Sequence, residues 1–118
     1  MSEHPIVHID LSAVAARDAG KFYEQVFGWK ISVDETFDYV MFQAEGGPGG
    51  GFMNIGPDNP AGTVIPYLQS ADIEGDLQRI EQNGGETVQP KTEIAGTGWF
   101  ALFTDPSGNR MGLFTWKG

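Results

Sequence analysis

One order of local patterns occurs twice along the chain, and this repeat constrains the fold more than any other feature. Each half begins with a β-rich segment, continues with a helical stretch and ends with three further β-rich segments. The halves meet in residues 57–63, a segment rich in Pro, Gly and Asn that is typical of a linker. The pattern predicts two βαβββ modules in one α+β domain, the first over residues 5–56 and the second over residues 64–116.

The first half is predicted to hold one helix between short strands. Apolar residues recur at spacings of three and four from Ala16 to Phe27, and Gly28 follows where a helix often ends. The β-rich segments are Ile6–Leu11, Trp29–Val33, Tyr39–Ala44 and Phe52–Ile55. The glycine-dense segment Glu45–Gly51 matches no phosphate-loop spacing and no helix follows it, so it predicts a mobile hairpin loop.

The second half repeats this organisation. Asp72 is a good N-cap for a helix whose apolar stripe ends before Asn83, Gly84 and Gly85. The β-rich segments are Val64–Ser70, Glu86–Val88, Gly98–Thr104 and Arg110–Trp116. Residues 105–109, Asp-Pro-Ser-Gly-Asn, predict the turn between the last two strands.

The first strand alternates between apolar and polar residues. In an extended chain, such alternation places the two kinds of side chain on opposite faces of the sheet. The apolar set is Val7, Ile9 and Leu11, and the polar set is His8, Asp10 and Ser12. Because one helix can cover only one face, we expect the polar face to line a pocket that is buried by a partner copy, a ligand or both.

The charge balance restricts the partners of the chain. Seven Lys and Arg stand against sixteen Asp and Glu, which gives a formal net charge of −9. Nucleic acids and anionic membranes are therefore poor partners, whereas a cationic small molecule is compatible. The chain has no cysteine, which excludes disulfides and thiolate sites, and we expect a cytoplasmic protein without a signal peptide or membrane span.

Two segments resemble a known superfamily. The string from His8 to Trp29 resembles the opening of vicinal-oxygen-chelate proteins, and the string from Phe103 to Phe114 resembles their closing turn and strand. This superfamily includes glyoxalase I, bleomycin-resistance proteins and extradiol dioxygenases. The resemblance covers essentially the whole chain and implies paired βαβββ modules around a central cleft, in a homodimer.

The resemblance also implies four strand positions that bind one divalent metal in the metal-dependent members. In this chain the four positions, in order, hold His8, one of Gly51, Phe52 and Met53, then Pro66 with Tyr67 beside it, and finally Gly112. Only the imidazole is a competent ligand, whereas a catalytic zinc ion is normally held by three protein ligands. We therefore expect no family metal, with a divalent ion as the alternative.

Two other residues could add a ligand beside His8. His4 lies four residues away, about 13 Å along an extended strand, which is too far for a shared ion. Asp10 lies on the same face at about 6.6 Å along the strand, so a two-ligand site is the most that the sequence offers. His8 is also the one catalytic candidate, as a general base, and Asp10 either orients it or bonds across the sheet.

Several residues are candidates to contact a bound molecule. The predicted wall residues are Tyr39, Met53, Tyr67, Trp99 and Phe114. Alternation allows only one of Trp99 and Phe100 to face the cleft. Arg110 shares strand parity with Phe114 and could meet a ligand anion, although a surface ion pair is the more common role of such a residue.

These observations favour a protein of this superfamily that binds an organic small molecule in the cleft without the family metal. The first alternative is a metal-dependent, glyoxalase-like lyase, isomerase or dioxygenase. The second is a drug-sequestering resistance protein for a cationic antibiotic, and the third is a dimeric interaction module with a vestigial cleft. The sequence leaves open whether the protein is an enzyme.

Overall fold

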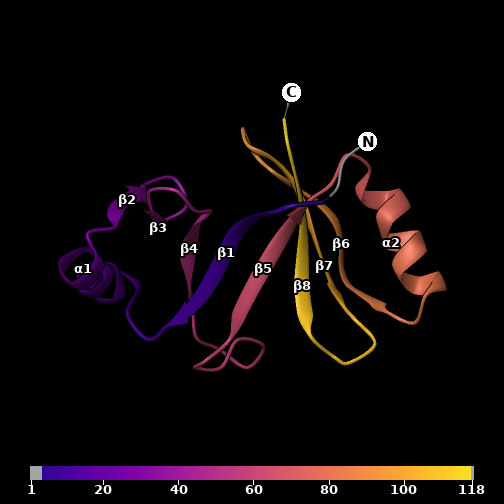
Figure 1. Ribbon diagram of the computed structural model, residues 1–118, viewed down its shortest axis with the longest axis horizontal. Coiled ribbons are helices and arrows are strands. Elements are labelled where there is room, and N and C mark those ends of the chain that lie inside the picture. Colours follow the sequence, from indigo (N-terminus) through magenta and orange to yellow (C-terminus); the bar gives the residue numbers. More distant parts are fainter. Residues whose placement is uncertain (1–3, 118) are drawn as a thin grey trace. The chain divides into compact units, whose positions relative to one another are not determined.

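A computed structural model describes residues 4–117, which contain two helices and eight strands (Figure 1). The elements are β1 (Ile6–Ala13), α1 (Ala16–Phe27), β2 (Lys30–Asp34), β3 (Tyr39–Gln43), β4 (Gly49–Asn54), β5 (Val64–Gln69), α2 (Ile73–Gln82), β6 (Glu86–Ile94), β7 (Gly98–Thr104) and β8 (Arg110–Trp116). The predicted order of strand, helix and three strands in each half is confirmed, and so is the α+β class.

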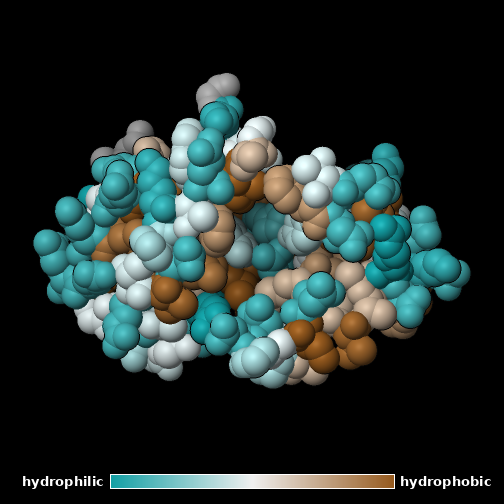
Figure 2. Space-filling model, turned by 180° about the vertical axis from the view of Figure 1, so that it is seen from behind, coloured by the Kyte–Doolittle hydropathy of each residue, from teal (hydrophilic) through white to brown (hydrophobic). Residues whose placement is uncertain are grey.

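The chain divides into two compact units. The first unit is Val7–Ile65, and the second joins the residues from Pro66 onward to those before Val7. Within residues 4–117, neither helix has the length and apolar character needed to cross a membrane. Hydrophilic side chains make up much of the face seen in Figure 2, as expected for a chain with a net charge of −9.

In the first unit, the strands lie in the order β2-β3-β4-β1. The β1–β4 pair is parallel, and the other two pairs are antiparallel. Helix α1 covers one face, ends at Gly28 with φ of 74°, and packs on a core of Ala13, Val40, Phe42 and Phe52. Ile9 and Leu11 of β1 contact this core, which confirms the predicted alternation and turns His8 and Asp10 to the other face.

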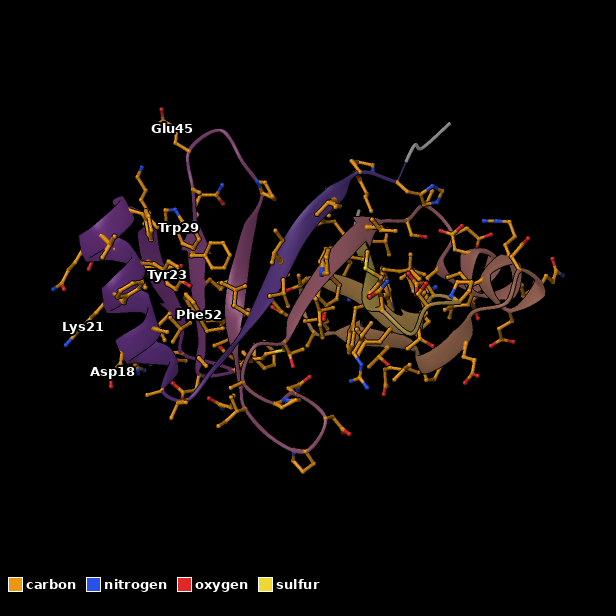
Figure 3. The ribbon with its side chains drawn as sticks, turned by 60° about the horizontal axis from the view of Figure 1, so that its bottom comes forward. Asp18, Lys21, Tyr23, Trp29, Glu45 and Phe52 are labelled. Carbon is orange, nitrogen blue, oxygen red and sulfur yellow. The ribbon has the colours of Figure 1, made fainter. Side chains whose placement is uncertain are left out.

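Aromatic stacking fixes α1 on its sheet. The ring centroids of Tyr23 and Trp29 lie 4.8 Å apart, and those of Trp29 and Phe42 lie 4.5 Å apart. Figure 3 shows Tyr23 of α1 directed toward Trp29 and Phe52, whereas Asp18 and Lys21 point away from the sheet. The face that carries α1 is therefore packed and apolar, which leaves the opposite face of the first unit for polar chemistry.

The predicted hairpin loop Glu45–Gly51 is only partly right: residues 45–48 form the turn between β3 and β4, but the last three glycines are strand residues. Gly49 to Gly51 form the first half of β4, in register with His8 to Asp10 of β1. A Cβ added at Gly50 would lie 1.9 Å from the carbonyl oxygen of Ile9. Glycine is needed here because neighbouring groups approach the backbone closely, and flexibility is not the reason.

In the second unit, the strands lie in the order β5-β8-β7-β6, with β5 and β8 parallel. The Asp72 carboxylate caps α2 by accepting a hydrogen bond from the Gly75 amide at 3.1 Å, as predicted. The core consists of Ile73, Leu77, Ala101, Phe103 and Leu113. Strand β6 extends to Ile94, past its predicted end, because irregularities in the pairing with β7 accommodate the segment around Pro90.

Candidate functional site

Three polar side chains meet on the face of the first unit that is turned away from α1. His8 and Asp10 come from β1, and Tyr39 is the first residue of β3. His8 Nε2 lies 2.9 Å from Asp10 Oδ1 and 3.1 Å from Tyr39 Oη. The Tyr39 hydroxyl donates to the same Asp10 oxygen at 2.5 Å. We call these three residues the polar triad.

The triad geometry determines which nitrogen of His8 carries a proton. The hydroxyl proton of Tyr39 is used in its bond to Asp10, so Nε2 cannot receive it. Without a proton of its own, Nε2 would direct a lone pair at a carboxylate oxygen 2.9 Å away, which is repulsive. Nε2 is therefore the donor to Asp10, and in the neutral ring the accepting nitrogen is Nδ1.

Tyr39 also fills the space beside Gly51. Gly51 of β4 is in register with Asp10 and with Met41, so it lies on the same face as the triad. A Cβ added at Gly51 would lie 1.8 Å from Tyr39 Oη and 2.0 Å from Tyr39 Cζ. The tyrosine ring thus occupies the volume in which a longer side chain at position 51 would have to stand.

The second unit also places a tyrosine over a glycine, but from a strand that is parallel to the glycine strand, whereas β3 is antiparallel to β4. Tyr67 of β5 is in register with Gly112 of β8, and a Cβ added at Gly112 would lie 2.2 Å from Tyr67 Cδ2. Tyr67 is buried, with 8% of its surface exposed. Strand alternation places Pro66 on the opposite face, so Tyr67 shares the face of Gly112.

The side chains at these positions do not fit the metal centre that the resemblance implies. Glycine supplies no ligand at position 51 or 112, and a tyrosine ring fills the adjacent space in each unit. Among residues 4–117, no group of three His, Asp or Glu side chains comes close enough to hold an ion. His8 and Asp10 alone give two donors, fewer than the three protein ligands of a catalytic zinc site.

The structure brings some of the other predicted contact residues to these faces. Met53 is in register with Ser12, on the triad face of the first unit. Phe114 and Arg110 share the Gly112 face of the second unit by strand alternation. All three are half-buried.

Trp99 is not brought to the Gly112 face. Its ring packs against the core beneath α2, with Lys91 Nζ at 5.3 Å and Lys117 Nζ at 5.6 Å from the ring centroid. The alternative that alternation allowed, Phe100, is directly opposite Phe114 and shares its face. The sequence could not choose between Trp99 and Phe100, because both are large aromatic residues in one short strand.

The packing role of the two tyrosines does not follow from the sequence. Tyr39 is predicted as a wall residue, but its ring packs against Gly51 of the next strand and its hydroxyl bonds to Asp10, 29 positions away. The available signal was glycine within or directly before β-rich segments, at Gly112 and at Gly51, the latter one of the three candidates for the metal position of the first module. Such glycines indicate that another group approaches the backbone closely.

A second polar cluster surrounds Asp76 of α2. Asp76 is buried, with 7% of the residue exposed. Its carboxylate accepts hydrogen bonds from Ser70 Oγ at 2.6 Å and from Arg79, and His4 Nε2 lies 3.0 Å away. Burial raises the pKa of Asp76, but the bonds to Ser70 and Arg79 and the proximity of His4 outweigh it, so the pKa lies below its usual value.

The Asp76 cluster borders a shallow cavity of about 280 Å³ within the second unit. Its apolar lining comes from Leu68, Ile80, Phe103 and Leu113. This cavity lies on the α2 side of the sheet, opposite the face that carries Tyr67 and Gly112. The Asp76 cluster ties the residues before β1 to α2, and this is a structural role.

Comparison with solved structures identifies the fold. A hypothetical protein from Bacillus halodurans superposes with a TM-score of 0.76 at 13% identity, covering 98% of this chain and 96% of that one. Methylmalonyl-CoA epimerase from Mycobacterium tuberculosis gives 0.74 at 10% identity, covering 99% and 90%. A glyoxalase/bleomycin resistance protein/dioxygenase superfamily member from Vibrio splendidus gives 0.69 at 15% identity, covering 95% and 98%. At these identities the similarity concerns the fold alone.

Sequence comparison identifies the family. The chain is 25% identical over 113 residues to "Putative glyoxylase CFP32" from Mycobacterium bovis and to the protein of the same name from Mycobacterium tuberculosis. The match covers 90% of this chain but only 43% of those relatives. The family model for the Glyoxalase/Bleomycin resistance protein/Dioxygenase superfamily matches residues 6–113. The chain therefore belongs to the glyoxalase/bleomycin resistance protein/dioxygenase superfamily, as the first and last segments of its sequence predicted.

Proposed function

We propose that this protein binds an organic small molecule at the polar triad and does so without the metal of its superfamily. The observation that carries this proposal is the packing of the Tyr39 ring over Gly51, beside Asp10. The phenol of Tyr39 occupies the space that a metal-binding side chain at position 51 would need, and this phenol already bonds to the Asp10 carboxylate. The triad then recognises a ligand by hydrogen bonds instead of coordination.

Within this site, His8 carries an imidazole, the side chain most often used for general acid–base catalysis. Asp10 accepts a hydrogen bond from Nε2 and orients the ring. His8 is thus our candidate for proton transfer, with Asp10 orienting its ring.

Metal analysis and ligand binding test the proposal together. Protein purified without a chelating tag should contain well below one divalent ion per chain. Calorimetry with a library of small organic molecules should find one binding event per chain, weakened by His8→Ala and by Tyr39→Phe. Near-stoichiometric metal that is lost on His8→Ala would contradict the proposal.

That outcome would favour the second candidate, a metal-dependent lyase, isomerase or dioxygenase. The observation in its favour is that His8 and Asp10 share one face of β1, two donors that an ion could use. The relative CFP32 carries the name of a glyoxylase, but this chain spans less than half of its length. The drug-sequestering alternative predicts a preference for cationic guests in the same library, which the net charge of −9 would support.

We further propose that the protein is a cytoplasmic homodimer, as its superfamily and its lack of cysteine suggest. Light scattering coupled to gel filtration would give the mass of the assembly. A mass of one chain at micromolar concentration would contradict the homodimer. The predicted domain limits and central cleft remain predictions that a ligand-bound crystal structure would test.

A further inference from the structure

We infer that Arg110 is the anion-binding residue of a second small-molecule site, within the second unit, which takes an organic carboxylate with an apolar body. This inference goes beyond the proposed function, which concerns the polar triad of the first unit. It is carried by the position of Arg110 in the second unit and by the charges around it.

Arg110 is the first residue of β8, on the face of the sheet opposite α2. Leu113 and Met111 contact the core beneath α2, so the alternate residues Arg110, Gly112 and Phe114 project to the other face. The antiparallel register places Thr104, Leu102 and Phe100 of β7 directly beside them. This face also includes Tyr67 and, beside Thr104, the exposed Glu86 of β6, which forms no ion pair with Arg110.

The surface ion pair that the sequence suggested for Arg110 is not formed with any residue that the structure describes. Four other basic residues do have carboxylate partners: Arg17 with Asp38, Arg79 with Asp76, Lys91 with Glu74 and Lys117 with Glu93. Arg110 is half-buried, whereas Arg17 is 60% exposed. Lys21 and Lys30 also have no carboxylate partner among residues 4–117, but both are exposed. Arg110 is therefore the one half-buried Lys or Arg without an anion among these residues.

This arrangement favours an anion supplied by the ligand. A partly desolvated guanidinium is stabilised by a charged hydrogen-bond acceptor, and its planar donors match the two oxygens of a carboxylate. Leu102 and Phe114 on the same face are suited to contact an apolar or aromatic body. A cationic guest would be repelled at this position, although the net charge of the whole chain attracts it.

The test compares phenylacetate with its neutral analogue phenylacetamide by NMR titration of the intact protein. Phenylacetate should shift the Nε–Hε resonance of Arg110 and the ring resonances of Phe114 and Tyr67. It should bind about tenfold more tightly than the amide, the change expected for a hydrogen bond between charged groups. Arg110→Gln should remove this difference, and Arg110→Lys should retain part of it because lysine keeps the charge but not the planar pair of donors.

Arg17→Gln is the matched control, since it removes an arginine that is exposed and paired with Asp38 in the first unit. It should leave the affinity for phenylacetate unchanged, and the NMR spectra of all variants should show a folded protein. Equal affinity for acid and amide, or no effect of Arg110→Gln, would overturn the Arg110 inference while small-molecule binding stands. The inference would also be overturned if phenylacetate, benzoate and acetate at millimolar concentration all failed to shift the Arg110 resonance. A shift of that resonance with inorganic phosphate alone would overturn it as well.

Discussion

The ring of Tyr39 lies over the backbone of Gly51, and its hydroxyl donates to Asp10, so one side chain both fills a packing site and bonds the polar triad. The packing of the ring and the hydrogen bond of the hydroxyl can be perturbed separately. Substitutions at positions 51 and 39 therefore distinguish the two roles.

Gly51→Ala should destabilise the protein by about 1–3 kcal/mol, because the added methyl group overlaps the Tyr39 ring and must displace it. The matched control is Gly47→Ala, where a Cβ would meet nothing within 4 Å. Urea unfolding of both variants gives the comparison. Equal stability of the two variants would show that the Tyr39 ring is not held against position 51.

Tyr39→Phe should lower the free energy of unfolding by about 1 kcal/mol, since it removes the hydrogen bond to Asp10 and keeps the ring over Gly51. The same variant serves as a control for Gly51→Ala, because it leaves the packing intact. If Tyr39→Phe lowers the free energy of unfolding as much as Gly51→Ala does, the hydroxyl, and not the ring, carries the stabilisation.

The protonation of His8 can be observed directly by ¹⁵N NMR. In the wild type, the neutral ring should be a single tautomer with the proton on Nε2, because that nitrogen donates to Asp10. Asp10→Ala should lower the population of the tautomer with the proton on Nε2. A wild-type ring protonated on Nδ1 in its neutral form would contradict the hydrogen-bond assignment of the triad.

Asp76 makes stability depend on pH. Its pKa is lowered in the folded state, so the ionised carboxylate stabilises the fold above the ordinary pKa, about 4 in the unfolded chain. This stabilisation is lost as the pH falls through the lower, folded-state pKa. Asp76→Asn should therefore cost about 1–3 kcal/mol at pH 7, and its difference from wild type should shrink toward pH 2.

Asp58→Asn, in an exposed turn, is the control for this comparison and should match the wild type at both pH values. Urea unfolding at several pH values measures both variants. A difference between wild type and Asp76→Asn that stays constant down to pH 2 would show that the charge of Asp76 does not carry its contribution.

Treatment with a chelator should leave the melting temperature of the wild type unchanged, because the proposed function uses no metal. The control is His8→Ala under the same conditions, which should respond to the chelator no differently. A fall in melting temperature that is restored by a divalent ion only when His8 is present would contradict the proposed function.

The sequence predicted those parts of the fold that depend on local patterns. The helix Ala16–Phe27, its end at Gly28 and the cap at Asp72 follow from spacing and side-chain chemistry within a few residues. The alternation of Ile9 and Leu11 with His8 and Asp10 likewise followed from strand geometry alone.

The features that the sequence did not predict depend on contacts between distant segments. Gly49 to Gly51 resemble a loop locally, and only the close approach of β1 and of Tyr39 explains them as strand residues. The bond between Tyr39 and Asp10 joins residues that are 29 positions apart. The face of Trp99 depends on the register of β7, which a run of large apolar residues does not specify.

The paired glycines and tyrosines restrict how an ion-binding centre could be introduced into this chain. A histidine or glutamate introduced at position 51 or 112 alone would collide with the ring of Tyr39 or Tyr67. Shortening either tyrosine alone would leave a void without adding a ligand. Each unit would therefore need a new ligand and a smaller residue in place of the tyrosine at the same time, and neither replacement alone would create a metal ligand with room to bind.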